Sequence, residues 1–359
     1  MRVLVVGAGP AGLYFSYLAK RREPDWELRV VEQNRADSTF GFGVVFSDRA
    51  LEFLREDDPG TYELITPRME SWTDLKVVHR GTPVVIDGIG FAAIGRLELL
   101  RLLQQQLASV GIVPEYEKRV SDSSSEFDLI VAADGVNSTV RGWHDFGTTV
   151  GTLTNKFAWY GTPQPFDTLT QTFVPNEHGT FNAHHYRHSS RMSTFVAECD
   201  AATWERAGFA AMSEAATLGY LEELFGYPLV SNKSVWRNFP NLRNRRWFVG
   251  NTVLIGDALR TAHFSIGSGT RLAMEDAIAL VKALSENPIP EALAAFEAAR
   301  RPIVEKLVAA ADASGAWYER FPEHMKLAPR EFAWSYIQRS GRVDPARLRK
   351  ISPGFVDGR

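Results

Sequence analysis

The residues whose types and spacing most clearly indicate chemistry stand near the start of the chain, in the run Gly7-Ala8-Gly9-Pro10-Ala11-Gly12. An apolar run precedes them, a helical pattern follows, and Glu32 closes the next apolar run about twenty residues later. Glycines in this pattern allow a tight turn, a close backbone approach to a pyrophosphate and close helix packing. Glu32 can accept hydrogen bonds from a ribose hydroxyl, and its charge disfavours a phosphorylated ribose. The motif predicts a dinucleotide site formed by Gly7, Gly9, Gly12 and Glu32; the alternative is a tight turn without a ligand.

Two further motifs follow apolar strands later in the chain. The sequence Ala-Asp-Gly-Val-Asn-Ser-Thr-Val-Arg spans 133–141, and Gly256-Asp257-Ala258 precedes the run from His263 to Thr270 and a helical pattern. Asp257 at a strand end can bind a second ribose, and a glycine loop before a helix presents backbone N–H groups to a developing negative charge. The first motif alone fits NAD as well as FAD, so the distinction between the two cofactors depends on these two later motifs. Each could instead be an ordinary polar turn.

The elements that must position these motifs follow from the hydrophobic pattern. Continuous apolar runs predict buried strands, and apolar residues at helical spacing predict helices. Near the N-terminus they make a βαβ unit. Proline at 302 predicts a kink or interruption of the last long helix. The predicted strands are 3–6, 28–31, 129–132 and 253–255, and the predicted helices are 11–20, 96–108, 273–284 and one starting near 291.

Between 156 and 198 the pattern changes to short segments separated by Gly, Pro and Asn turns, which predicts an antiparallel sheet. The predicted fold class is α/β, with a Rossmann-type dinucleotide-binding domain, an inserted antiparallel-sheet substrate domain and C-terminal helices. The predicted boundaries are 1–150 with 240–286 for the first domain, including a strand excursion near 65–90, then 151–239 for the second and 287–359 for the helical segment.

Composition excludes several classes of partner. The 359 residues carry a formal net charge of −3 without a broad basic field, so neither nucleic acid nor a membrane surface is expected as a partner. Cys199 is the only cysteine, which excludes an intrachain disulfide and agrees with a reducing cytoplasm, and the N-terminus does not read as a signal peptide. The cluster His184-His185-Tyr186-Arg187-His188 invites a metal interpretation, but neighbouring strand residues face opposite sides, so no metal site is predicted.

The three motifs, in this order across almost the whole chain, make the sequence resemble the single-component FAD-dependent aromatic hydroxylases related to para-hydroxybenzoate hydroxylase. The resemblance implies FAD as the cofactor and NADH or NADPH as a transient co-substrate. It assigns the adenosine half of FAD to the first glycine motif and Glu32, and the ribityl-pyrophosphate region to Asp257 of the Gly256-Asp257 pair. Further contacts that it implies come from Arg96, Asp134, Arg141 and the loop Gly267-Ser268-Gly269 beside the isoalloxazine ring.

Finer resemblances point to two branches. The segments 40–48, 263–274 and 340–344 resemble salicylyl-CoA 5-hydroxylases and 2-aminobenzoyl-CoA monooxygenases. The segments 155–156, 159–162, 192–195 and 236–239 resemble the hydroxylase that acts on a tryptophan-derived substrate in violacein biosynthesis. Many relatives carry a proline-rich loop after Gly-Asp, whereas His263-Phe264-Ser265 stands here. An aryl-CoA thioester such as salicylyl-CoA or 2-aminobenzoyl-CoA is the favoured substrate, and an indole or tryptophan derivative is the alternative.

The implied reaction is hydroxylation of an activated aromatic ring by O2 through a hydroperoxide at carbon 4a of the flavin, in a monomer or homodimer. No metal site is predicted, so the cofactor must carry the oxygen chemistry. His263 is the candidate catalytic residue, for orienting the substrate or assisting proton release; a structural histidine is the alternative. A flavin halogenase, a flavin reductase and a non-catalytic FAD-fold binding module are more distant alternatives. The predicted substrate pocket, which could instead be plain core, comprises Phe42, Val45, Trp159, Tyr160, Phe181, Tyr186 and Phe264.

Overall fold

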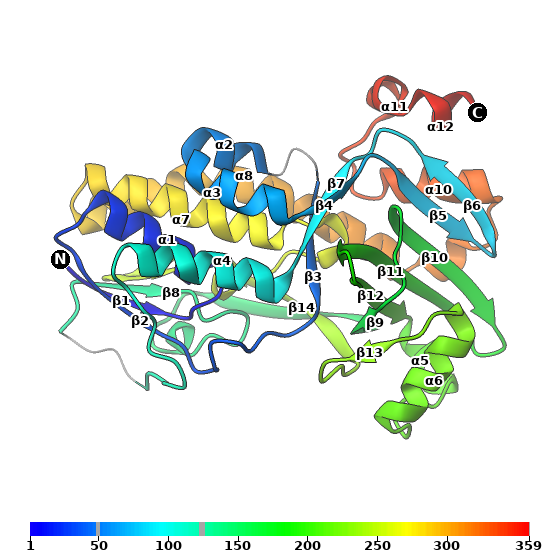
Figure 1. Cartoon of the computed structure of the whole chain (residues 1–359), viewed down its shortest axis with the longest axis horizontal. Coiled ribbons are helices and arrows are strands. Elements are labelled where there is room, and N and C mark those ends of the chain that lie inside the picture. The colour runs from blue at the N-terminus through cyan, green and yellow to red at the C-terminus, as the bar shows by residue number, and fades with distance from the viewer. Residues whose placement is uncertain (48–50, 122–125, 359) are drawn as a thin grey trace.

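The computed structural model describes residues 1–47, 51–121 and 126–358, and a mainly parallel sheet lies beside its N-terminus (Figure 1). The apolar run after Met1 forms β1 (Arg2–Val6), which pairs in parallel with β2 (Glu27–Val31) and β8 (Leu129–Ala132). The sheet order is β15-β16-β8-β1-β2, with β15 (Phe248–Val249) and β16 (Thr252–Leu254) at one edge. The strands predicted from apolar runs are confirmed, and β1, β8 and β16 are apolar because nearly all of their residues are buried.

Four long helices pack together in this part of the molecule: α1 packs against α4 and α7, and α7 packs against α8. Their bounds are α1 (Pro10–Arg22), α4 (Arg96–Ser109), α7 (Gly269–Glu286) and α8 (Ile289–Tyr318). Helix α8 continues through Pro302, so of the two predicted effects the interruption is wrong, and a kink stays a prediction. A proline inside a helix costs about 3 kcal/mol. Burial of Phe296, Val304 and Leu307 on either side of it offsets that cost.

A second, eight-stranded sheet occupies the other end of the molecule (Figure 1). Its order is β13-β9-β12-β11-β10-β5-β6, and β14 pairs with β9 off this path. All pairings are antiparallel except the one between β10 and β5. The predicted antiparallel sheet is therefore present, and the excursion near 65–90 supplies two of its strands. The strands are β5 (Leu75–His79), β6 (Thr82–Ile86), β9 (Thr148–Thr162), β10 (Leu169–Asn176), β11 (Gly179–Ser189), β12 (Met192–Cys199), β13 (Val230–Ser231) and β14 (Arg237–Asn244).

Smaller elements complete the fold. A three-stranded sheet of order β3-β7-β4 contains β3 (Gly43–Ser47), β7 (Phe91–Gly95) and β4 (Glu70–Trp72). Asp48, which ends one of the family-like segments, lies outside the described residues. The remaining helices are α2 (Glu52–Asp57), α3 (Pro59–Ile65), α5 (Ala201–Arg206), α6 (Glu214–Phe225), α9 (Phe321–His324), α10 (Pro329–Gln338), α11 (Pro345–Ile351) and α12 (Pro353–Asp357).

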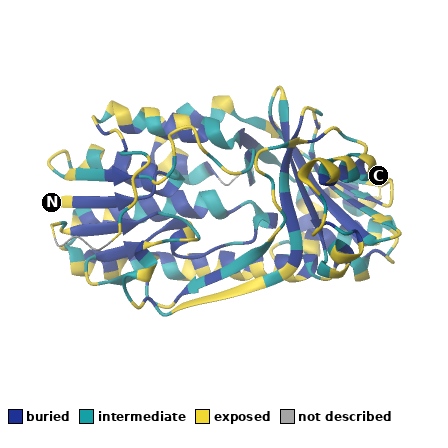
Figure 2. Cartoon of the chain, turned by 90° about the horizontal axis from the view of Figure 1, so that it is seen from below, coloured by how far each residue is buried: buried dark blue, intermediate teal, exposed yellow. Residues whose placement is uncertain are grey.

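The apolar interior falls into three clusters. Figure 2 shows buried ribbon at both ends of the molecule. One cluster surrounds the parallel sheet. The second joins one face of the eight-stranded sheet to the end of α8 and to α10, for example through Phe173, Trp317 and Phe332. The third joins the opposite face to residues of α6, for example through Phe195 and Leu221. The eight-stranded sheet is therefore covered on both faces, and we call the face toward α8 the inner face.

Among the described residues, no helix combines the length and apolarity that crossing a membrane requires. Within the same residues, no group of three or more His, Cys, Asp and Glu side chains is arranged to hold a metal ion.

Candidate active site

The first glycine motif forms the turn between β1 and α1, and two of its glycines are sterically required. Gly7 has φ +104°, and a Cβ there would stand 2.3 Å from the carbonyl oxygen of Ala133. A Cβ on Gly12 would stand 1.9 Å from the carbonyl oxygen of Gly7. Gly9 differs, because a Cβ there would meet nothing within 4 Å. The chain itself does not need glycine at position 9, so the open space in front of it is available to a ligand.

A pocket of about 520 Å³ opens in front of this turn and is lined by Gly7, Gly9, Glu32, Arg96 and Asp134. This volume lies within the range usual for cofactor sites. Glu32 at the end of β2 accepts hydrogen bonds from the Ala8 N–H at 2.9 Å and from the Asn34 N–H at 2.8 Å. The structure thus brings together five predicted site residues from separate stretches of the chain. Their glycine turn, helix N-terminus and carboxylate suit the adenosine and pyrophosphate of FAD.

Asp134 and Arg141, which the sequence assigned to cofactor binding, shape the loop after β8. The Asp134 carboxylate accepts hydrogen bonds from the N–H groups of Thr139 and Val140 at 2.7 and 3.2 Å. Burial raises the pKa of Asp134, and these hydrogen bonds oppose the rise. The Arg141 guanidinium donates to the carbonyl oxygens of Val136 at 2.7 Å and Ala258 at 3.0 Å. Arg141 therefore joins this loop to the Gly256–Ala258 turn.

The Gly256–Ala258 turn exposes Asp257 while Gly256 and Ala258 are buried. The surrounding protein raises the pKa of Asp257, and the positive charges of Arg260 and Arg96 lower it. This interaction places Arg96, at the start of α4, near the turn. Among the described residues, no group donates a hydrogen bond to the exposed Asp257 carboxylate. It can therefore accept hydrogen bonds from the ribityl or ribose hydroxyls of FAD.

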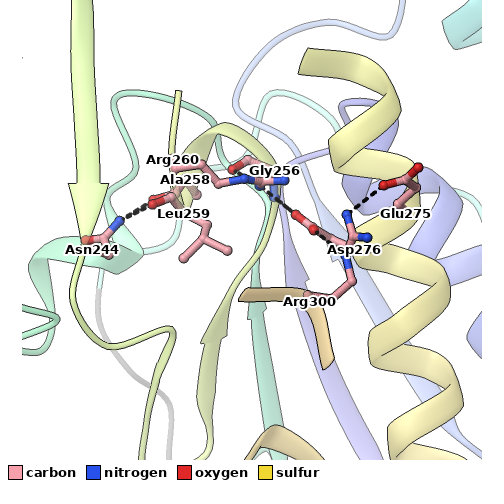
Figure 3. Close-up of polar contacts among 8 residues, drawn as sticks. All are labelled: Asn244, Gly256, Ala258, Leu259, Arg260, Glu275, Asp276 and Arg300. Atoms are coloured by element: carbon pink, nitrogen blue, oxygen red, sulfur yellow. Dashed lines mark hydrogen bonds and ion pairs between the residues drawn. The ribbon is translucent and has the colours of Figure 1, made fainter. Parts of the chain in front are cut away.

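A buried ionic network holds this turn from behind (Figure 3). Asp276 Oδ2 accepts hydrogen bonds from the Gly256 N–H at 3.1 Å and from Arg260 Nη1 at 2.6 Å, and Oδ1 accepts one from Arg300 Nε at 3.3 Å. Arg300 Nη2 also binds Glu275 Oε2 at 2.8 Å. On the other side, Asn244 Nδ2 donates to the carbonyl oxygens of Ala258 and Leu259 at 3.2 and 2.5 Å. The network fixes the backbone of the turn that carries Asp257, and sequence reasoning missed it because its members come from α7, α8 and β14.

The loop Gly267-Ser268-Gly269 leads into α7, and aromatic side chains stand beside it. Gly267 has φ +60°, and a Cβ there would stand 3.0 Å from the carbonyl oxygen of Val45 on β3. Phe264 lies with its ring centroid 5.4 Å from that of Trp159 and 5.0 Å from that of Phe157. The structure therefore brings Val45, Trp159 and Phe264 to the same region, at the N-terminus of α7.

Two other predicted pocket residues lie close to this region. The Phe42 ring lies over Gly161 of β9, where a Cβ would be 2.5 Å from a ring carbon. Tyr186 is buried on the inner face and donates its hydroxyl to the carbonyl oxygen of Gly43 at 3.0 Å. We call Phe42, Phe157, Trp159 and Phe264 the aromatic face. Phe157 was not predicted; its alternation with Trp159 along β9 was the signal that could have found it.

Tyr160 and Phe181, also predicted for the pocket, lie elsewhere. Both belong to the core cluster that packs the opposite face of the eight-stranded sheet against α6. The reason is strand parity: Tyr160 neighbours Trp159 on β9, and neighbouring strand residues point to opposite faces. Phe181 and Tyr186 are separated by an odd number of positions along β11, so they also point to opposite faces. The structure does not bring these two residues to the aromatic face, and it assigns them to the core.

His263, the predicted catalytic residue, is 3 % exposed and stacks on Phe264. Its Nδ1 and the Ser265 hydroxyl are 2.7 Å apart, and the Ser265 and Ser314 hydroxyls are also 2.7 Å apart. Burial lowers the pKa of His263 to about 3, helped by the charge of Arg339. A neutral imidazole can orient a group by hydrogen bonding, but with so low a pKa it holds an accepted proton only transiently. His263 is therefore better suited to orienting a bound group than to acting as a base.

Four buried polar residues on the inner face, Gln171, Asn182, His184 and Glu198, were not predicted as a group. Burial lowers the pKa of His184 to about 3 and raises that of Glu198 to about 8. The His184–His188 cluster is split between the faces: His184 stands near Tyr186, with ring centroids 5.5 Å apart, whereas His185 stacks on Phe195 of the opposite face. His188 bonds the Thr194 hydroxyl through Nδ1 at 3.0 Å.

Glu198 gives the protein a pH-dependent stability. Its pKa rises from 4.5 to about 8 on folding, so between these values the folded state binds a proton that the unfolded state has released. The free energy of unfolding therefore falls as pH rises through this window. We expect Glu198→Gln to remove that fall. Between pH 5 and pH 8, the free energy of unfolding of the variant should therefore rise by at least about 1 kcal/mol relative to that of the wild type. Urea unfolding at both pH values measures this, and an unchanged difference would contradict it.

Comparison with known proteins identifies the family of this chain. The family described as FAD binding domain matches residues 101–311. The chain is 43 % identical to a salicyloyl-CoA 5-hydroxylase of a Streptomyces species, over 99 % of this chain and 73 % of that protein. It is 36 % identical to the protodeoxyviolaceinate monooxygenase of Chromobacterium violaceum, over 96 % of each chain. It is also 36 % identical to a 3-hydroxy-4-methyl-anthranilyl-[aryl-carrier protein] 5-monooxygenase of Streptosporangium sibiricum, over 90 % of each.

Among solved structures, the tetrameric form of 2-methyl-3-hydroxypyridine-5-carboxylic acid oxygenase has the same fold, with a TM-score of 0.75 and 18 % identity over 98 % of this chain and 95 % of that one. The predicted α/β fold class is confirmed, and so are both branches of the resemblance. The glycine turn and its pocket are features that a dinucleotide-binding fold of this kind provides. The chain therefore belongs to the FAD-dependent aromatic hydroxylases, monooxygenases that use NAD(P)H as co-substrate.

Proposed function

We propose that this chain hydroxylates an ortho-substituted benzoyl thioester, such as salicyloyl-CoA or 2-aminobenzoyl-CoA, with O2 as the oxidant. The proposal rests on the names of two relatives, at 43 % and 36 % identity. One is named for a salicyloyl group on CoA, and the other for an anthranilyl group on a carrier protein. Both names describe a benzoyl group with an ortho hydroxyl or amino group, joined to a thiol. Such substituents activate the ring toward an electrophilic oxygen.

The roles of the site residues are part of this proposal. Gly7, Gly9, Gly12 and Glu32 would hold the adenosine and pyrophosphate of FAD, with Arg96 and Asp134 beside them. Asp257 would hold the ribityl chain, and Arg141 would keep its turn in place. The loop Gly267-Ser268-Gly269 would lie beside the isoalloxazine ring. The boundaries 1–150 with 240–286, 151–239 and 287–359 remain our proposed division into domains.

The chain's own contribution to the reaction is orientation and shielding. When bound and reduced, FAD supplies the activation of O2. The N–H groups at the start of α7 would stabilise negative charge, an effect of up to about 2 kcal/mol when partly buried. Phe42, Trp159 and Phe264 of the aromatic face would stack on the substrate ring and keep water away from it. His263, neutral and held by Ser265, would orient the substrate.

A substrate comparison tests the proposal. We expect NAD(P)H consumption by the FAD-loaded protein to rise at least about tenfold with salicyloyl-CoA. The reason is that contacts with the CoA group add binding energy that free salicylate lacks. Free salicylate should leave the rate near its basal value. The product should have gained one oxygen atom, as measured by mass spectrometry.

An indole is the second candidate, supported by the 36 % identity to the protodeoxyviolaceinate monooxygenase. Rate enhancement by indoles or tryptophan derivatives and not by aryl-CoA thioesters would replace the first proposal with this one. We further propose a cytoplasmic location, in keeping with the single buried cysteine, and a monomer or homodimer.

A further inference from the structure

Four polar side chains occupy adjacent positions on the inner face of the eight-stranded sheet. In the strand register, Asn182 of β11 pairs with Glu198 of β12, and His184 of β11 pairs with Gln171 of β10. Asn182 and His184 are two residues apart on one strand, and paired residues point to the same side, so all four share a face. We call Gln171, Asn182, His184 and Glu198 the polar block. A contiguous polar group in the middle of a covered sheet is unusual.

The polar block is buried, and much of its hydrogen-bonding capacity is unused. Its four residues are 0–5 % exposed. Gln171 Oε1 accepts from Asn182 Nδ2 at 3.3 Å and from the Tyr318 hydroxyl at 3.0 Å, and Glu198 Oε1 accepts from Asn155 Nδ2 at 2.8 Å. The unpartnered atoms, as judged within the described residues, are both ring nitrogens of His184, Gln171 Nε2, Asn182 Oδ1 and Glu198 Oε2. Buried polar atoms without partners are rare and costly, so such a concentration points to a ligand.

The polar block adjoins the aromatic face. Trp159 pairs with Val196 of β12, and Val196 pairs with His184, so His184 lies two strands from Trp159, about 10 Å away at the usual strand spacing. Phe157 pairs directly with Glu198. His263 lies close enough to His184 to interact with it electrostatically, which places the block beside the loop before α7. A ring stacked on Trp159 and Phe264 would thus have an edge directed toward the block.

We propose that the polar block binds the hydrogen-bonding substituent of the aromatic substrate, and that His184 is the residue that selects rings carrying such a substituent. The inference rests on the proposed function and assigns its ring specificity. A neutral imidazole has one donor and one acceptor, so it can pair with a hydroxyl or an amino group equally well. Gln171 Nε2 adds a donor and Asn182 Oδ1 an acceptor. A ring without the substituent leaves these atoms unpaired, and discrimination by unpaired buried groups is strong.

Binding measurements with two thioesters test this assignment. The FAD-loaded protein is titrated with salicyloyl-CoA and with benzoyl-CoA, which lacks the ortho hydroxyl, and the change in flavin absorbance gives each dissociation constant without turnover. We expect His184→Leu to weaken salicyloyl-CoA binding at least about tenfold and benzoyl-CoA binding less than about twofold. His184→Gln, which keeps a donor and an acceptor, should recover most of the loss.

The neighbouring histidine provides the control. His185 is equally buried, but its Nε2 already bonds the Thr172 hydroxyl at 2.9 Å on the opposite side of the sheet. His185→Leu should leave the ratio of the two dissociation constants unchanged. The assignment is overturned if His184→Leu leaves that ratio unchanged or if His185→Leu changes it equally. Should His184→Leu fail to retain FAD, the nearly isosteric Gln171→Met is judged by the same ratio.

Failure of the proposed function would look different. It would show as a wild-type protein that binds neither thioester but turns over an indole. The same variants would then be titrated with that indole and its N-methyl derivative, which lacks the N–H group. If His184→Leu reduces the preference of the protein for the indole over its N-methyl derivative, the role of the polar block is supported. If the preference is unchanged, that role is overturned.

Discussion

Gly9→Ala should abolish tight FAD binding while leaving the fold intact. Gly9 has φ −78°, which alanine adopts without strain, and the added methyl group would meet nothing within 4 Å in the chain. The methyl group would instead stand in the pocket, where a pyrophosphate has to approach the backbone. We expect the dissociation constant for FAD to rise at least about a hundredfold, equivalent to roughly 2.7 kcal/mol. Flavin fluorescence titration measures it, and urea unfolding of the flavin-free protein checks the fold.

Gly142→Ala is the matched control for this experiment. A Cβ added at Gly142 would also meet nothing within 4 Å, and Gly142 does not line the pocket. Its replacement should change neither FAD affinity nor stability appreciably. Full FAD affinity in Gly9→Ala would show that no ligand approaches the first glycine turn, and the assignment of that turn to the pyrophosphate would fail.

Asp276→Ala should destabilise the protein more than any surface substitution. Asp276 is 0 % exposed, and its carboxylate accepts hydrogen bonds from Arg260, Arg300 and the N–H of Gly256. Its removal leaves two buried guanidinium groups without their shared partner. Breaking a buried ionic network in this way costs about 3–5 kcal/mol. The free energy of unfolding from urea titration measures this cost, and flavin release should accompany it, because the Asp257 turn loses its support.

Glu305→Ala provides the comparison. Glu305 pairs with Arg301 at 3.4 Å, and its side chain is 64 % exposed. An exposed pair of this kind contributes about 0–1 kcal/mol. Equal losses in the two variants would mean that burial does not strengthen the Asp276 network, which would contradict its proposed role as the support of the turn.

Sequence reasoning succeeded where a local pattern has one structural solution. The apolar runs at 3–6 and 129–132 could only be buried strands in a chain of this composition. The turn itself dictates glycine at 7, where φ is +104°, and at 12, where a Cβ would stand 1.9 Å from the carbonyl oxygen of Gly7. Glu32, at the end of the neighbouring strand, follows from the same βαβ geometry. These features need no knowledge of distant contacts.

Strand parity in the eight-stranded sheet could not be predicted in the same way. Alternation identifies the inner face of a strand only when the other face is polar and exposed. Along β11 both faces are buried almost throughout, because helices cover both sides of the sheet. Tyr160 and Phe181 therefore look as suitable for a pocket as Trp159 and Tyr186 do.

Long-range pairing explains the remaining omissions. Strands β5 and β10 pair in parallel across some ninety residues of chain, a contact with no local signal. The polar block depends on the register of three strands, and the Asp276 network on two helices and a turn. Each residue in them is unremarkable until its neighbours in space are known.

The paired strands β9 and β14 have a mechanical consequence. Their ladder runs from Phe157 paired with Arg237 to Thr148 paired with Asn244. At one end stands the aromatic face, and at the other Asn244 binds the carbonyl oxygens of Ala258 and Leu259, next to Asp257. The same pair of strands therefore connects the aromatic face to the turn that carries Asp257. We expect the two halves of the molecule to keep their spacing as ligands come and go, with adjustment confined to the loops on either side.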